Sequence, residues 1–201
     1  MMILRSTPAS PFARKAHIAA SVLGLDGEIA VEGVDLNDPG DSIRRQNPLG
    51  KIPALLVEDG NVYFDSRVIL DYLDHRAGGG RIVPSAPARR FAALRLQALA
   101  DGIMDASILI VYESRYRAAE KREATWVERQ AEKVARALAA LEQAPPATEA
   151  TPTVGDIALA CALGYIDFRL PQVDWRAKNP ALAAWYAEVA ERPSMRATAP
   201  G

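Results

Sequence analysis

The spacing of hydrophobic and polar positions changes near residue 77, and this change divides the chain into two regions. Before it, short apolar runs alternate with amphipathic segments. After it, apolar residues recur three or four positions apart over long stretches, which is the spacing of helices. The pattern predicts an α/β unit over 1–77, a linker rich in glycine and proline over 78–87, and an all-helical unit over 88–201.

The first unit alternates between strands and helices. Apolar and alternating runs predict strands and a hairpin at 2–5, 28–36 and 52–64, the hairpin turning at Asp59-Gly60. Helical spacing predicts helices at 10–23 and 65–76, with at most a short helix within 38–50. Gly24 is expected to end the first helix. The expected order is therefore β-α-β-(α)-β-β-α.

The second unit is expected to contain helices at 87–117, 121–143, 153–170 and 178–192. The segment 153–170 is apolar nearly all round, which is typical of a helix at the centre of a bundle. It begins with "TVGD", in which Thr153 and Asp156 have the spacing of a capping box. We interpret both residues as structural.

The helix expected at 87–117 has two apolar stripes instead of the usual one. The first stripe contains Ala92, Leu96, Leu99, Ile103, Ala106 and Ile110. The opposite stripe contains Leu94, Ala98, Asp101, Asp105, Ile108 and Tyr112. One side should pack within its own unit, and the side with the two carboxylates should face a partner subunit or a cleft.

Composition excludes several classes of function. The chain has 201 residues, about half of them hydrophobic, and a formal net charge of -1, so charge gives no case for nucleic acid or an anionic membrane. No apolar run approaches the roughly 18 residues that a membrane span needs, and the first residues lack the core of a signal peptide. One cysteine, Cys161, and two histidines predict no internal disulfide and no metal site, and favour a cytoplasmic protein.

"STPASPFARK" marks the start of the first helix. Ser is a favoured N-cap, and Pro11 at the first helical position loses no hydrogen bond, so Ser10 fits a purely structural role. The same helix end carries partial positive charge and free N–H groups. The Ser10 hydroxyl can therefore also donate a hydrogen bond to a bound thiolate, and the residues alone leave both roles open.

Two further segments have the chemistry of a peptide-binding site. Ile52-Pro53 enters a strand where proline cannot donate to the ladder, and a cis bond there would leave the Ile52 backbone open to a peptide-like ligand. Asp65-Ser66 stands at a helix start, where N–H groups and a hydroxyl suit a ligand carboxylate and the Asp65 carboxylate suits an ammonium. Helix capping is the simpler interpretation of Asp65.

"SPFARK", "NPLGKIPAL", "FDS" and "TVGDIALA", in this order, resemble the cytosolic glutathione S-transferases, with "SPF" similar to the serine-type bacterial members. The similarity extends to the closing "NPALAAWYAEVAERPSMRAT". It implies a thioredoxin-like N-terminal domain that binds glutathione and an all-α C-terminal domain that carries the electrophile pocket.

The resemblance also implies roles for individual residues. Ser10 would hydrogen-bond the glutathione sulfur, with Thr7 as an alternative three residues earlier. Ile52, before a cis Pro53, would pair its backbone with the cysteinyl part of glutathione. Asp65 and Ser66 would hold the γ-glutamyl ammonium and carboxylate. The remaining glutathione candidates are Phe12 and Lys51, the latter for the glycyl carboxylate.

For the second substrate and the partner subunit, the resemblance gives weaker candidates. The electrophile pocket would be lined by Phe12, Tyr112, Arg115 and Tyr116. Asp101 or Asp105 would reach the glutathione of the other subunit across a dimer interface. Asp65 departs from the Glu or Gln that is usual in the family and has a shorter reach.

The implied protein is a dimeric cytoplasmic glutathione transferase that joins the glutathione thiolate to small hydrophobic electrophiles, without a metal. Two alternatives stay open at this stage. One is a glutathione-dependent isomerase or peroxidase on the same scaffold. The other is a non-catalytic relative that binds a protein partner.

Overall fold

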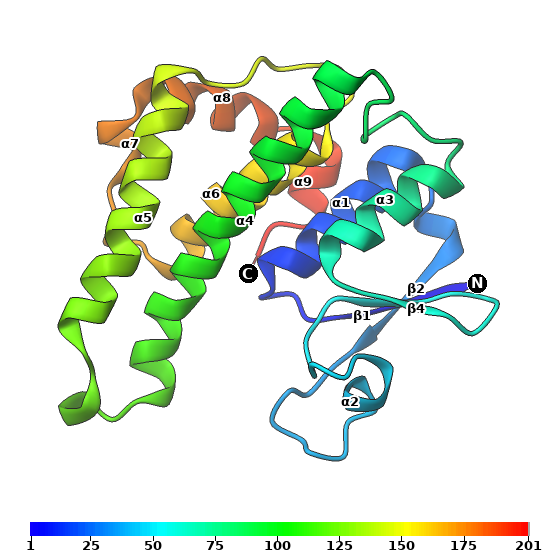
Figure 1. Ribbon diagram of the computed structural model, residues 1–201, viewed down its shortest axis with the longest axis horizontal. Coiled ribbons are helices and arrows are strands. Elements are labelled where there is room, and N and C mark those ends of the chain that lie inside the picture. Colours follow the sequence, from blue (N-terminus) through cyan, green and yellow to red (C-terminus); the bar gives the residue numbers. More distant parts are fainter. Residues whose placement is uncertain (201) are drawn as a thin grey trace.

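The computed structural model describes residues 1–200 and consists of a small sheet unit beside a larger helical unit (Figure 1). The strands are β1 (Met2–Ser6), β2 (Ile29–Gly33), β3 (Ala54–Leu56) and β4 (Val62–Tyr63). The longer helices are α1 (Pro11–Leu23), α3 (Ser66–Arg76), α4 (Pro87–Tyr116), α5 (Ala124–Gln143), α6 (Val154–Arg169) and α8 (Pro180–Ala190). The short helices are α2 (Ile43–Gln46), α7 (Trp175–Lys178), α9 (Pro193–Ala197), η1 (Asp26–Glu28) and η2 (Ala119–Lys121).

The sheet has the order β2-β1-β3-β4, with β1 parallel to β2 and antiparallel to β3. The pair β3 and β4 forms the expected hairpin, which turns at Gly60 with φ 88°. Helices α1 and α3 lie together over one face of the sheet (Figure 1). The element order predicted from the sequence is confirmed, and this arrangement is the thioredoxin-like domain of the predicted fold class.

In the helical unit, α6 lies against both α4 and α1. Its side chains from Val154 to Ile166 are all buried, so the prediction of a central apolar helix is confirmed. The small residues of α6 allow it to pack closely against α4. A Cβ atom on Gly155 would lie 2.7 Å from the Ala93 carbonyl oxygen of α4. The helices can approach this closely only where one of them lacks a side chain.

The predicted inner stripe of α4 is confirmed only in part, since Ile103 and Ala106 are buried but the centre of the buried face lies elsewhere. The buried face runs between the two predicted stripes and includes Ala93, Gln97, Ala100, Met104, Ser107 and Val111. Leu99, which was assigned to the inner stripe, is 38% exposed. The error arises because two polar side chains, Gln97 and Ser107, lie on the buried face, where the pattern predicted apolar residues.

Some predicted boundaries also differ. Strand β2 stops at Gly33 instead of residue 36, since Asp35 begins a loop in which the Asp41 carboxylate accepts a hydrogen bond from the Asp35 N–H. The last predicted helix, 178–192, corresponds to α8, and the short helices α7 and α9 precede and follow it, with prolines at the starts of α8 and α9. Gly24 ends α1 with φ 76°, as predicted. No helix among residues 1–200 is both long and apolar enough to cross a membrane.

The segment between the units is fixed by one buried carboxylate. Asp74, near the end of α3, accepts hydrogen bonds from the backbone N–H groups of Gly80, Arg81 and Ile82 at 2.7–3.0 Å. The preceding glycines adopt positive φ angles of 75–99°, a region that favours glycine. The glycine run therefore has a defined path that sets α4 against the sheet unit.

Candidate functional site

Ser10 caps the first helix and keeps a free donor. Its hydroxyl oxygen accepts a hydrogen bond from the Ala13 N–H at 3.2 Å, while Pro11 begins the helix. A hydroxyl accepts and donates at the same time, so the Ser10 O–H remains able to donate to a ligand. The cap and the ligand-binding role are therefore compatible. Thr7 begins the same loop, directly after β1, and its carbonyl accepts a hydrogen bond from the Ser10 N–H.

The turn before β3 leaves the Ile52 backbone outside the strand ladder. The Ile52–Pro53 peptide bond is cis, and β3 begins its ladder with Ala54 opposite Arg5, so Ile52 lies outside the ladder. Buried Asn47 shapes the preceding turn by donating to the Lys51 carbonyl at 2.8 Å. The Lys51 side chain is left exposed beside this turn.

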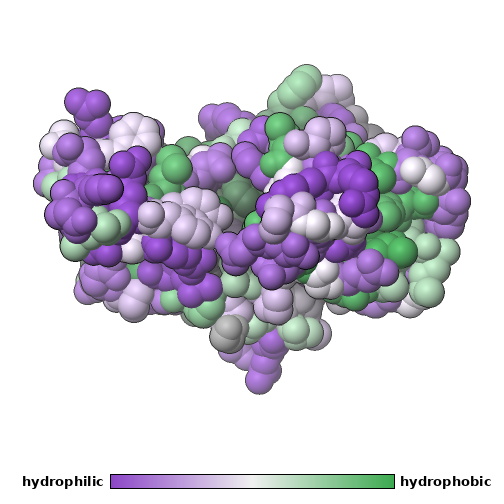
Figure 2. Space-filling model, turned by 90° about the horizontal axis from the view of Figure 1, so that it is seen from below, coloured by the Kyte–Doolittle hydropathy of each residue, from purple (hydrophilic) through white to green (hydrophobic). Residues whose placement is uncertain are grey.

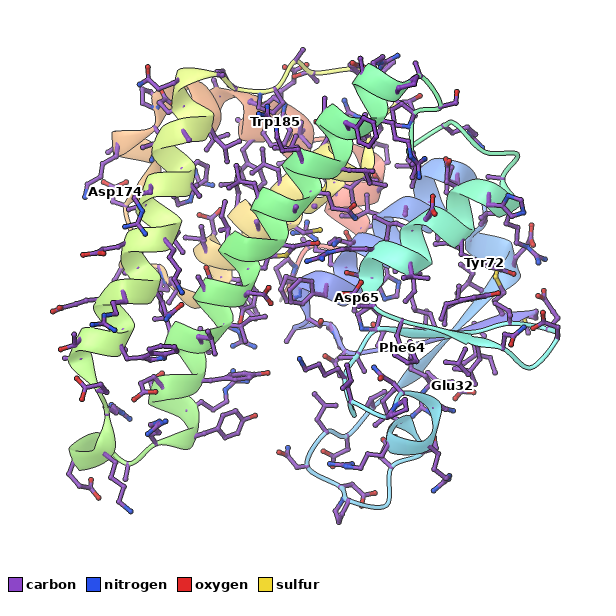
Figure 3. The ribbon with its side chains drawn as sticks, viewed as in Figure 1. Glu32, Phe64, Asp65, Tyr72, Asp174 and Trp185 are labelled. Atoms are coloured by element: carbon purple, nitrogen blue, oxygen red, sulfur yellow. The ribbon has the colours of Figure 1, made fainter. Side chains whose placement is uncertain are left out.

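The start of α3 forms the third part of the site. Asp65 caps the helix by accepting a hydrogen bond from the Arg67 N–H at 2.9 Å. The Phe64–Asp65 peptide bond is cis, and both residues lie on the turn between β4 and α3 (Figure 3). Ser66 follows and is buried, with its hydroxyl accepting a hydrogen bond from the Lys15 ammonium at 3.0 Å.

Lys15 belongs to a buried ion cluster that we did not predict from the sequence. Its ammonium lies 2.6 Å from one oxygen of Asp101, and the Arg67 guanidinium lies 2.7 Å from the other oxygen. Lys15 is fully buried and Asp101 is 1% exposed. The sequence held one signal, because Lys15 is three residues after Phe12 and four before Ala19, on the apolar face of its helix. A charge on that face requires a buried partner.

The cluster joins the two units at the site. Lys15 comes from α1, Ser66 and Arg67 come from α3, and Asp101 comes from α4. The hydrogen bond from Lys15 fixes the Ser66 hydroxyl, so its own hydrogen points to another acceptor. The residues at the starts of α1 and α3 are thus brought together by contacts within one chain.

The two carboxylates of α4 have different surroundings. Asp101 is 1% exposed, and its two oxygens accept from Lys15 and Arg67 of its own chain. Asp105, one turn later, is exposed. Partial burial and the Asp101 charge raise the pKa of the Asp105 carboxyl, while the charges of Arg67 and Lys51 act in the opposite direction.

The candidates for the electrophile pocket come from two elements, with Phe12 at the start of α1 and Tyr112, Arg115 and Tyr116 at the end of α4. Figure 2, a view from below, shows a hollow between the helical half and the sheet half in which hydrophobic residues are visible. Phe12 is half-buried, with the Lys15 ammonium 5.6 Å from its ring centre. Tyr112 and Tyr116 form an edge-to-face pair at 5.0 Å, and Arg115 between them is exposed.

Two other groups, the Cys161 thiol and the capping box of α6, have roles in the fold. Burial raises the pKa of the Cys161 thiol to about 12, so this thiol stays protonated at neutral pH. The capping box of α6 is present, with the Thr153 hydroxyl accepting from the Asp156 N–H and the Asp156 carboxylate accepting from the Thr153 N–H. Residues 1–200 contain no group of three or more His, Cys, Asp or Glu side chains arranged to hold a metal ion.

Comparisons with known proteins agree with this architecture. The family model for the glutathione S-transferase N-terminal domain matches residues 9–76, and the model for the C-terminal domain matches residues 124–188. The uncharacterized GST-like protein YibF of Escherichia coli K12 is 35% identical over 202 residues, which cover 99% of this chain and 98% of that protein.

Solved structures extend the similarity. A glutathione transferase family member from Pseudomonas fluorescens Pf-5, crystallised with glutathione, is 44% identical over the full length of both chains, with a TM-score of 0.94. A second structure from that organism, also 44% identical over both full lengths, holds S-(propanoic acid)-glutathione, with a TM-score of 0.90. The two domain matches and the full-length relatives together cover the whole chain. The chain belongs to the glutathione S-transferase family.

Proposed function

We propose that this protein is an enzyme that binds glutathione, stabilises its thiolate and directs it to a small hydrophobic electrophile. The observation that carries the proposal is the Ser10 hydroxyl, which caps α1 through its oxygen and still has a hydrogen to donate. The sulfur of glutathione would lie at this helix N-terminus, whose N–H groups and dipole also favour negative charge.

The rest of glutathione would bind along the three segments already described. The Ile52 backbone, outside the strand ladder, would pair with the cysteinyl part of the tripeptide. Ser66 would donate its hydroxyl to the γ-glutamyl carboxylate, and the free oxygen of Asp65 would hold the ammonium. Lys51, exposed beside the cis-Pro53 turn, would hold the glycyl carboxylate. Charges on both ends fix the orientation of the tripeptide.

Thiolate stabilisation accounts for the expected catalysis. A free thiol with a pKa of about 8.5 is only a few per cent ionised at neutral pH. A hydrogen bond from Ser10 to the charged sulfur, worth roughly 1.5–3 kcal/mol, lowers that pKa by about one to two units. Phe12, Tyr112, Arg115 and Tyr116 would line the wall against which the electrophile binds. Titration calorimetry with millimolar glutathione tests the proposal most directly, and a lack of binding would overturn it.

Ser10→Ala is expected to raise the pKa of the enzyme-bound thiol by about one to two units and to slow conjugation about tenfold or more below pH 7. The deficit should shrink as the pH rises, because the thiol then ionises without help. Ultraviolet absorbance of the bound thiolate, followed against pH, measures the shift. Thr7→Ala is the control and should leave the titration unchanged. The opposite pattern would transfer the role from Ser10 to Thr7.

We also propose a homodimer that forms through the exposed side of α4. Exposed residues recur there three, four or seven positions apart, as in a helix contact seam: Phe91, Ala98, Gly102, Asp105, Leu109 and Tyr112. Because Asp105 lies on this seam and Asp101 does not, Asp105 is our candidate for the carboxylate that reaches the partner's glutathione.

Leu109→Glu is expected to shift the protein from dimer to monomer, because it places a charge in the seam on both subunits. Analytical ultracentrifugation at several concentrations measures the change. Val31→Glu, at an exposed apolar position on β2, is the matched control and should keep the wild-type assembly. A wild-type protein that sediments as a monomer at all concentrations would contradict the dimer.

The proposed working place is the cytoplasm, where glutathione is kept as the reduced thiol that this reaction consumes. Removal of reactive electrophiles from the cell is the corresponding physiological role.

A further inference from the structure

Arg5 of β1 carries its charge on the face of the sheet opposite to α1 and α3. Its neighbour Leu4 is buried in the core, and successive strand residues point to opposite faces. Figure 1 shows α2 on the side of the sheet that α1 and α3 do not cover. Arg5 is 6% exposed, and its guanidinium donates to four groups: the Gly33 carbonyl at 3.1 Å, the Asp41 carboxylate at 3.1 Å, the Ser42 hydroxyl at 2.5 Å and the Gln46 side-chain carbonyl at 2.8 Å.

These acceptors belong to one stretch of chain, from the end of β2 to the end of α2, which has few other anchors. Within 34–46, Ile43 is the only buried residue. Helix α2 has four residues, and a helix this short depends on packing for its stability. Asp41 also accepts from the Ile43 and Asp35 N–H groups, and these bonds and the Arg5 charge lower the pKa of its carboxyl. Arg5 and Ile43 together therefore hold α2 against the sheet.

Helix α2 leads directly into the turn that presents Lys51. The helix ends at its C-cap, Asn47, which is 2% exposed. The Asn47 side chain donates to the Lys51 carbonyl at 2.8 Å and accepts from the Leu49 N–H at 3.0 Å. The position of α2 therefore sets the position of Asn47 and, through it, the position of Lys51.

The other half of this turn is held independently of the Arg5 side chain. The backbone of Arg5 pairs with Ala54 of β3, directly after cis-Pro53, and a substitution of the side chain leaves this ladder in place. The Arg5 side chain thus governs the half of the turn that carries Lys51. The strand ladder governs the half that carries Ile52.

We propose that Arg5 is a positioning residue for the glycyl end of glutathione. It is buried beneath α2, so it does not touch the ligand and acts through α2 and Asn47, which place the Lys51 ammonium for the glycyl carboxylate. This inference rests on the proposed function and names the residue on which selection of the complete tripeptide depends.

Glutathione and γ-glutamylcysteine separate this end of the site from the rest, because only glutathione has the glycine that carries its carboxylate one residue farther along. Ser10, Asp65 and Ser66 would bind the parts that the two share, and none of them bonds to the Arg5 network. The measured quantity is the Kd of γ-glutamylcysteine divided by the Kd of glutathione, from titration calorimetry, which we call the glycine preference. We expect a wild-type value of about tenfold or more, the range of one charge-assisted hydrogen bond.

Arg5→Met is expected to reduce the glycine preference to near one, because α2 loses its polar anchor and Lys51 loses its place. The Kd of γ-glutamylcysteine should change by less than about twofold, as for sites that do not interact. Gln46→Met removes only the bond from Arg5 to the end of α2 and should reduce the preference severalfold. This milder variant keeps the proposal testable if Arg5→Met fails to fold.

A double-variant cycle shows whether Arg5 acts through Lys51. Lys51→Met should itself reduce the glycine preference to near one. Adding Arg5→Met to Lys51→Met should then change the preference by less than about twofold, because both substitutions remove the same contact and their effects do not add.

Arg76→Met is the matched control. Arg76 also joins separate segments of the same domain, through Glu28 and Glu58, but it does so at the Met2 end of β1, away from the site. Its substitution removes an ion network of the same domain and should leave the glycine preference within about twofold of the wild-type value.

The outcomes separate a positioning role from general support of the fold. Equal weakening of both ligands by Arg5→Met, or the same loss of preference in Arg76→Met, would refute the inference and assign Arg5 to the fold alone. An unchanged preference in Arg5→Met and Gln46→Met would also refute it. A wild type that binds the two ligands equally would overturn the inference and leave the transferase proposal intact. A wild type that binds neither would overturn the proposed function, and the inference with it.

Discussion

Asp101→Ala is expected to lower the free energy of unfolding by about 3–5 kcal/mol, the usual cost of leaving one partner of a buried ion pair alone. The variant leaves the fully buried Lys15 ammonium with the Ser66 hydroxyl as its remaining partner. Arg67 loses the same carboxylate, but it is about half exposed and can turn to water. The loss should therefore come from Lys15. Chemical denaturation of the folded protein measures it.

A double variant tests whether this loss of stability comes from the unpaired charge of Lys15. Lys15→Met combined with Asp101→Leu replaces both ions by apolar side chains, and such replacements are often neutral or stabilising. It should recover most of the stability that Asp101→Ala loses. Glu132→Ala breaks an exposed pair with Arg136 on α5 and should cost only about 0.3–0.5 kcal/mol. A loss from Asp101→Ala no larger than that of Glu132→Ala would show that the buried cluster contributes little.

The same variant should weaken glutathione binding. Lys15 holds the Ser66 hydroxyl in place, so an unpaired Lys15 that moves toward water releases the group proposed to bind the γ-glutamyl carboxylate. The double variant should restore stability but not affinity, because methionine cannot donate to Ser66.

Gly155→Ala is expected to destabilise the protein by about 1–3 kcal/mol or more, as overpacking of a closely packed core does. The new Cβ would lie 2.7 Å from the Ala93 carbonyl oxygen and 2.8 Å from the Leu96 Cβ, both on α4. Neither is the end of a flexible side chain, so α4 and α6 must separate. Thermal and chemical unfolding measure the loss.

Gly102→Ala supplies the matched control on α4. A Cβ there meets nothing within 4 Å, and alanine is favoured over glycine in a helix by about 0.8–1 kcal/mol. This variant should therefore be neutral or more stable, with light scattering to confirm that its assembly is that of the wild type. Equal effects of the two substitutions would contradict the close approach of α4 and α6.

Features that depend on neighbours in sequence were predictable. Ser10, Asp65 and Thr153 each cap a helix through an N–H two or three residues later, so local chemistry was sufficient to find them. The all-apolar α6 was predictable for a similar reason, because a helix with no polar face has no alternative to the interior.

Features that depend on distant contacts were not predictable. Lys15 and Asp101 are 86 positions apart, and nothing in either segment identifies the other as its partner. The centre of the buried face of α4 was missed because Gln97 and Ser107 interrupt its apolar pattern. Arg14 resembled any solvent-exposed arginine until the last residues of the chain were placed against it.

The glycine run after α3 has a consequence for how substrates exchange. A stretch of consecutive glycines between two domains is a natural hinge, but here the following backbone is bound by the buried Asp74 carboxylate. The two domains are therefore joined rigidly, and the site between them does not open by their swinging apart. Entry of substrate and release of product must depend on local motion at the rim, for example of the chain end that Arg14 holds.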